Sequence, residues 1–107
     1  MRALARLGRV TLTAAATLAL VTGLSTGAQA ATGDFTYTNV HGDDFVNDNP
    51  ENGECFLLIG GAVHAVNSTD TRATVYLDRG CEEGPSELAP GTARDFGDPL
   101  PHSVMFG

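Results

Sequence analysis

Apolar residues in this chain after residue 30 come in short runs, each closed by glycine, proline, asparagine or aspartate. No run carries the 3.6-residue stripe of an amphipathic helix. Asp34–Thr38 alternates and predicts a half-buried strand, whereas the unbroken apolar run Cys55–Ile59 predicts a strand covered on both faces. Further strands are expected at 62–66, 72–77 and 103–106. The pattern predicts a small all-β domain with antiparallel strands.

Turn-forming residues mark the connections. His41–Glu54 is rich in Gly, Asp, Asn and Pro and predicts a long loop, interrupted by Phe45-Val46 as a short strand or anchor. Gly60-Gly61 predicts a sharp bend or a bulge, and 67–70 a hairpin turn. Pro90-Gly91 fits the two central positions of a type II turn.

The amino-terminal segment has the pattern of a secretory signal peptide. It opens with three basic residues, Arg2, Arg6 and Arg9. An apolar stretch, Val10–Leu24, follows, and Ala28-Gln29-Ala30 is a small-x-small cleavage site. The apolar stretch is shorter than the roughly 18 to 20 residues that span a bilayer, which disfavours a membrane anchor. We therefore expect a leader at 1–30 and a secreted, extracellular domain of 77 residues at 31–107.

The charge of that domain limits its partners. Residues 31–107 contain three arginines, no lysine and thirteen acidic residues, a net charge of −10. Nucleic acids and anionic membranes are bound through lysine and arginine, so neither is an expected partner. A cation or a basic protein surface is compatible with this charge, and so is acidity that serves solubility alone.

Cys55 and Cys81 are the two cysteines of the chain. An exported chain with two cysteines most simply forms one disulfide, and such a cross-link is commonly added to a domain of this size. A redox pair or metal ligation are the alternatives. The chain has no C-x-x-C sequence and no zinc-site spacing to support them.

Two similar patterns follow each other along the domain. Phe35 precedes Gly42 by seven residues, and Tyr76 precedes Gly84 by eight. The first half ends in Ala-Val at 65–66 and the second begins its last strand with Ser103-Val104, so equivalent positions lie about forty residues apart. An aromatic, a later glycine and then a serine before an apolar residue resemble the βγ-crystallin Greek-key motif, which occurs in pairs.

That resemblance implies an antiparallel Greek-key sandwich. Gly42 and Gly84 would adopt a backbone conformation that side chains disfavour, and Ser103 would tie down a folded hairpin. Ala65 stands where the first motif would have its serine. The chain is also similar to small exported proteins of actinobacteria, and some microbial metalloproteinase inhibitors share the crystallin-like fold.

The resemblance also implies calcium as a candidate ligand, because calcium is the common ligand of the family. Its ligand positions would fall at 60–65 and 98–103, where only Asp98 and Ser103 keep a suitable oxygen. A second candidate is an acidic and amide-rich segment, whose oxygens suit a hard cation although the spacing is not that of an EF-hand. Its members are Asp43, Asp44, Asn47, Asp48, Asn49, Glu51, Asn52 and Glu54. A solvated or partner-binding loop is the alternative.

No enzyme motif is present. His41, His64 and His102 are the available bases, but no G-x-S-x-G or H-E-x-x-H sequence accompanies them. We expect no catalysis and no cofactor. Two hypotheses follow: a protein-binding module, inhibitor-like in character, that presents the 43–54 loop to an extracellular protein, or a calcium-responsive structural protein of the cell envelope or spore surface.

Overall fold

The computed structural model describes residues 29–107 of the chain. Eight strands make up the domain: β2 (Gly33–Asn39), β3 (Asp44–Asp48), β4 (Cys55–Leu57), β5 (Ala62–Thr69), β6 (Ala73–Tyr76), β7 (Ser86–Leu88), β8 (Thr92–Asp95) and β9 (Ser103–Phe106). Residues 29–107 include no helix that could cross a bilayer. The all-β prediction is confirmed. The predicted leader falls outside the described residues except for its last two positions.

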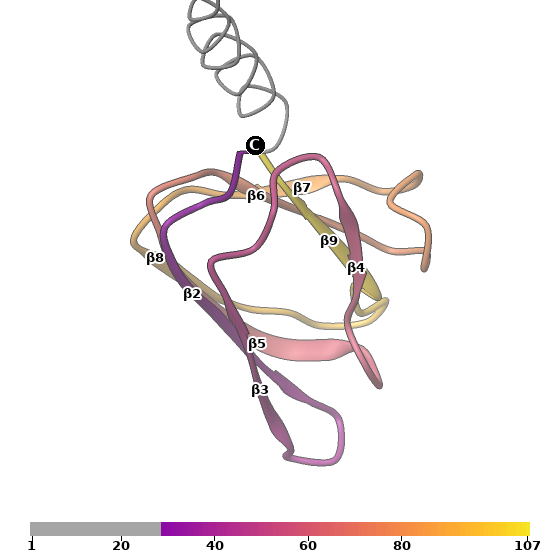
Figure 1. Ribbon diagram of the computed structural model, residues 1–107. Coiled ribbons are helices and arrows are strands. Elements are labelled where there is room, and N and C mark those ends of the chain that lie inside the picture. The colour runs from indigo at the N-terminus through magenta and orange to yellow at the C-terminus, as the bar shows by residue number, and fades with distance from the viewer. Residues whose placement is uncertain (1–28) are drawn as a thin grey trace, which may run out of the picture.

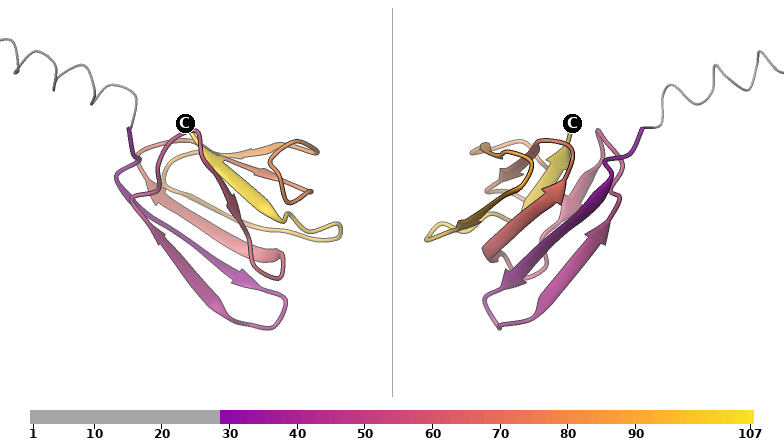
Figure 2. Two further views of the ribbon diagram at one scale, coloured as in Figure 1. Left: turned by 45° about the vertical axis from the view of Figure 1, so that its right-hand side comes forward. Right: turned by 90° about the vertical axis from the view of Figure 1, so that its left-hand side faces the viewer.

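The strands form two four-stranded antiparallel sheets, ordered β3-β2-β5-β8 and β4-β9-β6-β7. The two halves of the chain follow the same path. Strands β2, β3 and β5 share the first sheet while β4 crosses to the second, and β6, β7 and β9 share the second while β8 crosses to the first. The carboxyl terminus therefore lies near the start of the described chain, and the β2–β3 turn lies at the opposite end (Figures 1 and 2).

A compact apolar core fills the space between the sheets. The Phe106 ring lies at its centre, edge-on to the ring of Phe35 with 5.2 Å between centroids, and 6.0 Å from Phe56. Small residues complete the core, among them Ala62, Ala65 and Ala73, all fully buried. Their small side chains take up little of the space between the two sheets.

The predicted disulfide is confirmed. Cys55, at the start of β4, is bonded to Cys81, in the connection between β6 and β7, with 5.9 Å between their Cα atoms. It joins an edge strand to a long connection that has no strand pairing of its own.

The prediction of a fully covered strand at Cys55–Ile59 is wrong. Strand β4 is three residues long and lies at a sheet edge with β9 as its neighbour. Leu57 and Ile59 are 51% and 50% exposed, and Leu58 alone in this run enters the core. A continuous apolar run does not reveal how many faces of a strand are covered, since that depends on neighbouring elements.

The turn predicted at 67–70 is also wrong, because β5 continues to Thr69. Asn67 is fully buried, and its amide donates to the carbonyls of Thr71 and Leu88 at 2.9 Å each. The side-chain oxygen of Asn67 accepts from the hydroxyl of Thr69 at 2.6 Å. A turn-forming residue is tolerated inside this strand because every polar atom of its side chain is bonded.

Strands β7 and β8 were not expected from the sequence. Both are short and polar, and all four residues of β8 are exposed. The turn predicted between them is present: Gly91 has φ 77°, and the Thr92 amide donates to the Ala89 carbonyl at 3.2 Å. Only pairing with β6 and β5 identifies β7 and β8 as strands.

Candidate functional site

The short strand expected at Phe45-Val46 within the predicted binding loop is present as β3, an edge strand of the first sheet. It is longer than expected, since Asp44, Asn47 and Asp48 also belong to it. The extension has a physical cause. The Phe45 ring stacks on Tyr37 with 5.0 Å between centroids, and this contact, with the ladder to β2, outweighs the poor strand propensity of aspartate and asparagine. Only the residues before and after β3 are in loops.

Asp43 belongs to the tight β2–β3 turn, which is held by Asn39. The Asn39 side chain is buried, and its oxygen accepts from the amides of His41 and Asp43 at 2.9 and 3.0 Å. Gly42 has φ 83°, and a Cβ at this position would meet nothing within 4 Å. Glycine is therefore needed here for its backbone conformation and not for space.

The turn after β3 is anchored at both of its asparagines. Asn49 has φ 48°, and its amide and side-chain oxygen both bond to Gly33 at 2.8 Å. Asn52 forms an isolated parallel bridge with Phe106. The segment 49–54 is thus tied to the start of β2 and to the end of β9.

Two pairs of carboxylates lie close together near β3. Asp34 is opposite Asp48 across the β2–β3 ladder, and a hydrogen bond with Asp48, followed by burial and charge repulsion, raises the pKa of Asp34. In the turn that follows, a hydrogen bond with Glu51 and its negative charge raise the pKa of Glu54. All four groups are exposed. Like charges held this close favour a shared proton or a nearby cation.

Of the two oxygen-bearing ligand positions implied by the crystallin resemblance, only Ser103 is engaged in other bonds within residues 29–107. The Ser103 hydroxyl is fully buried and bonded within the chain, and Asp98 is exposed. In the part of the chain that the structure describes, no group of three or more His, Cys, Asp and Glu side chains is placed to hold a metal ion.

On the outer face of the first sheet, residues paired across the four strands line up in rows. In one row Thr38 donates to the Asp44 carboxylate at 2.6 Å, and the His64 Nδ1 lies 2.6 Å from a carboxylate oxygen of Asp95. The neighbouring row is apolar apart from one threonine. Its members, in strand order, are Val46, Thr36, Val66 and Ala93.

A shallow hollow of about 270 Å³ opens on this side of the sheet, beside Asp44, Val46 and His64. Sequence reasoning missed His64, Asp95 and Asp34 as members of the same surface. The period of two along each strand places residues on a face, but the register that aligns strands distant in sequence is visible only in the structure.

The motif residues of the second half all act on the β6–β7 connection. The Ser103 hydroxyl donates to the Asp78 carbonyl at 2.6 Å and accepts from the Cys81 amide at 3.0 Å. Gly84 has φ 61°, and a Cβ there would lie 2.5 Å from the Leu77 side chain. This connection is therefore fixed by a buried serine, a glycine and the disulfide.

Asp78 adds a further anchor to the same connection. Its carboxylate accepts from the amides of Gly80, Glu82 and Glu83 at 2.9 to 3.0 Å. These backbone hydrogen bonds, that of Glu83 first, lower the pKa of Asp78. Asp78 therefore serves the structure of the connection and was not identified by the sequence analysis.

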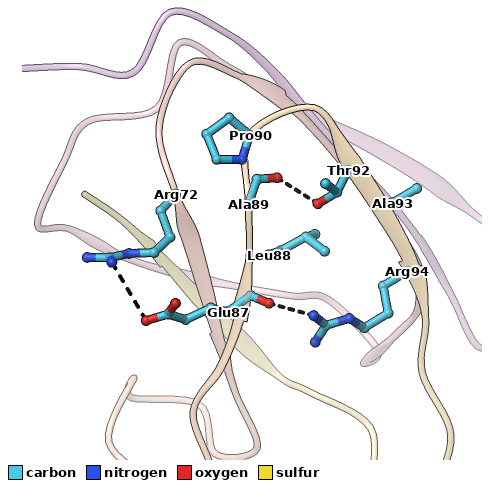
Figure 3. A pocket seen from close by; sticks show the side chains of 8 residues that line it. All are labelled: Arg72, Glu87, Leu88, Ala89, Pro90, Thr92, Ala93 and Arg94. Carbon is cyan, nitrogen blue, oxygen red and sulfur yellow. Dashed lines mark hydrogen bonds and ion pairs between the residues drawn. The ribbon is translucent and has the colours of Figure 1, made fainter.

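A second hollow, of about 370 Å³, lies where the chain passes from β7 to β8 (Figure 3). Arg94 donates to the Ser86 hydroxyl and to the Glu87 carbonyl at 2.5 and 2.6 Å, and Arg72 pairs with the Glu87 carboxylate at 3.7 Å. Both arginines lining this hollow are already engaged within the chain. An anion that entered this hollow would therefore have to displace Arg72 or Arg94 from its present partners.

No protein-family model, characterised protein or solved structure matches this chain. Three features of the structure bear on function: an acidic edge strand, an ordered outer sheet face and a disulfide-bonded connection on the second sheet.

Proposed function

We propose that this protein is a secreted, non-enzymatic domain that binds another extracellular protein through its acidic edge, residues 43–54. The observation that carries the proposal is the placement of this segment. It runs along an edge strand and an anchored turn, with Asp44, Val46 and Asp48 all exposed on β3. A segment already held in one conformation loses little entropy on binding. The disulfide supports an oxidising, extracellular location.

We further propose that the scaffold is a pair of crystallin-like Greek keys. The exchange of β4 and β8 between the sheets supports it, because each half then contributes three strands to one sheet and one to the other. The positive φ of Gly42 and Gly84 and the bonds from Ser103 to the β6–β7 connection support it as well.

The first half lacks an equivalent tie. Val104, which follows Ser103, is buried, and in the first half it is Ala65 that is fully buried while Val66 is half-exposed. Within this proposal, the alternation favours His64, rather than Ala65 as expected from the sequence, as the position that corresponds to Ser103. The β2–β3 turn is tied by Asn39 instead.

The binding proposal is tested by capture from culture fluid of the producing organism. Immobilised protein is compared with the double variant Asp44→Asn/Asp48→Asn, and Glu82→Gln/Glu83→Gln serves as a control that removes the same charge from the β6–β7 connection. We expect one or more proteins retained by the native chain and by the control, and lost from the β3 variant. Secreted proteases are assayed in parallel for inhibition. Equal retention by all three chains, or by none, contradicts the proposal.

The competing proposal is a calcium-responsive structural protein. The two carboxylate pairs, Asp34 with Asp48 and Glu51 with Glu54, favour it because a cation would relieve their repulsion. Calorimetry with millimolar calcium decides between the two proposals. A heat of binding and a rise in melting temperature support the calcium proposal, and the absence of both contradicts it.

Export itself is tested by mass spectrometry of the natural protein. We expect a chain that begins at Ala31 and is two hydrogens lighter than the reduced form. An intact amino terminus or two free thiols would contradict export.

A further inference from the structure

The outer edge of β3 presents backbone groups to solvent. At the two ends of the β2–β3 ladder, the Asn39 amide donates to the Asp43 carbonyl and the Asn49 amide to the Gly33 carbonyl. Since bonded pairs alternate in an antiparallel ladder, Phe45 and Asn47 bond to β2. The amides and carbonyls of Asp44, Val46 and Asp48 therefore point away from β2, where residues 29–107 supply no further strand.

The three residues with outward backbone groups also have exposed side chains on one face. Val46 is 64% exposed, and Asp44 and Asp48 stand two positions to either side of it. A strand added here would place its own alternate side chains directly opposite these three. The edge therefore combines a main-chain template with an acidic, apolar, acidic side-chain pattern.

Charge decides what kind of strand fits. A second copy of this chain, paired antiparallel about Val46, would put Asp44 of each copy against Asp48 of the other. Like charges directly opposite one another destabilise a strand pair, so the edge disfavours self-association. A strand with basic residues at both outer positions meets attraction at the same places.

We propose that β3 accepts, as a fifth strand of its sheet, an extended segment of a cationic protein with the pattern basic-x-apolar-x-basic. The apolar residue lies against Val46, and the basic residues lie against Asp44 and Asp48. The two basic groups are about 13 Å apart, the length of four strand residues. This inference rests on the proposed function and specifies the partner of the acidic edge.

The neighbouring residues of the sheet favour the same partner. Asp34 lies next to Asp48 on the adjoining strand, so one end of the site offers two carboxylates to a single cation. At the other end, the 270 Å³ hollow beside Asp44 and His64 leaves room for a long basic side chain. The outer rows of the four strands include no arginine side chain that would repel it.

Two synthetic peptides of identical composition provide the first test. The peptide TKTVTKT places valine and both lysines on one face of an added strand, whereas TTKVKTT places the lysines on the opposite face. In nuclear magnetic resonance titrations of the protein we expect TKTVTKT to bind about fivefold more tightly. Equal affinity of the two peptides overturns the proposal, because net charge alone would then explain binding.

Amide exchange in the same complex reports the main-chain contact. The Val46 amide should exchange freely without peptide and become protected with it, while the Phe45 amide is protected in both states. Binding of TKTVTKT without new protection at Val46 overturns strand addition.

A proline variant separates this inference from the broader function. Val46→Pro removes one outward amide without breaking the bonds to β2, and Val46→Thr is its matched control. We expect Val46→Pro to weaken TKTVTKT binding about tenfold and Val46→Thr to change it little. If Val46→Pro still captures the extracellular partner as the native chain does, strand addition fails while protein binding through the acidic edge stands. If the peptide binds as expected but no extracellular protein is captured, the strand-addition site stands and the broader function fails.

Discussion

The two hairpin connections of this domain, β2–β3 and β6–β7, occupy equivalent places in the two halves and are built in opposite ways. The first is a tight turn closed by its own Asn39, and the outer face of its sheet has no cover among the described residues. The second is longer and is held by Ser103, Asp78 and the disulfide from Cys81. The second connection thus has more anchoring groups than the first, and the first sheet keeps an exposed outer face that can present a surface.

The largest expected effect comes from removing the staple of the β6–β7 connection. Replacing both Cys55 and Cys81 with serine should lower the free energy of unfolding by about 3 kcal/mol, because the unfolded chain regains the freedom that the cross-link removes. Urea denaturation measures this, and reduction of the native protein is the control. Peptide binding at β3, measured on the folded fraction, should not change. A loss of binding would show that the two halves are not independent.

Ser103→Ala should cost about 2 kcal/mol, since it leaves the partly buried Cys81 amide and the Asp78 carbonyl without their partner. The matched change in the first half, His64→Ala, should cost under about 0.5 kcal/mol, because the His64–Asp95 pair is exposed. Thermal denaturation of both variants compares the halves. Equal losses would contradict the difference in anchoring.

Gly42 and Gly84 differ in the space around them. Both Gly42→Ala and Gly84→Ala introduce a side chain at positive φ, which costs about 1 kcal/mol. Only Gly84→Ala also drives a Cβ against Leu77, so it should be less stable than Gly42→Ala by about a further 1 kcal/mol. Paired denaturation curves give the difference, and Leu77→Ala in the Gly84→Ala background should recover part of it. A larger loss of stability for Gly42→Ala than for Gly84→Ala would contradict this prediction.

The smallest effect is a difference in pH dependence. Asp78 has a pKa below the ordinary value of 3.8, so its stabilising contribution is complete above that value and is lost as the pH falls through the folded pKa. Asp34 has a raised pKa, so its protonation stabilises the fold at low pH and that contribution is lost as the pH rises through the folded pKa.

Asp78→Asn should therefore be less stable than the native chain near neutral pH, with a deficit that shrinks in acid. Asp34→Asn should be more stable near neutral pH, with an advantage that shrinks in acid. Denaturation midpoints from pH 2.5 to pH 7 check both slopes. If the stability difference between variant and native chain changed with pH in the same direction for both variants, the two carboxylates would lie in similar environments in solution.

Several features of the fold were predictable from local pattern. The alternation of Asp34–Thr38 and the run Ser103–Phe106 gave strands near their observed bounds. The cysteine count gave the disulfide, and Pro90-Gly91 gave its turn. In each case a residue's own conformational preference or covalent chemistry was sufficient.

The candidate site was less accessible to sequence reasoning. The acidic composition of 43–54 drew attention to the right segment, but aspartate and asparagine indicate a loop, and β3 forms because Phe45 stacks on Tyr37 and the backbone pairs with β2. His64 and Asp95 are 31 residues apart and meet only through the pairing of β5 with β8. Polar strands such as β8 carry no periodic signal at all.

The sequence by itself determined the all-β class, the single cross-link, the strongly negative charge and the positions where glycine permits a positive φ. These follow from residue chemistry and from patterns a few residues long. The tertiary structure alone decided which strands lie at edges, which face stays open and which carboxylates become neighbours. Register and strand order depend on contacts between segments far apart in the chain, where local preference has no influence.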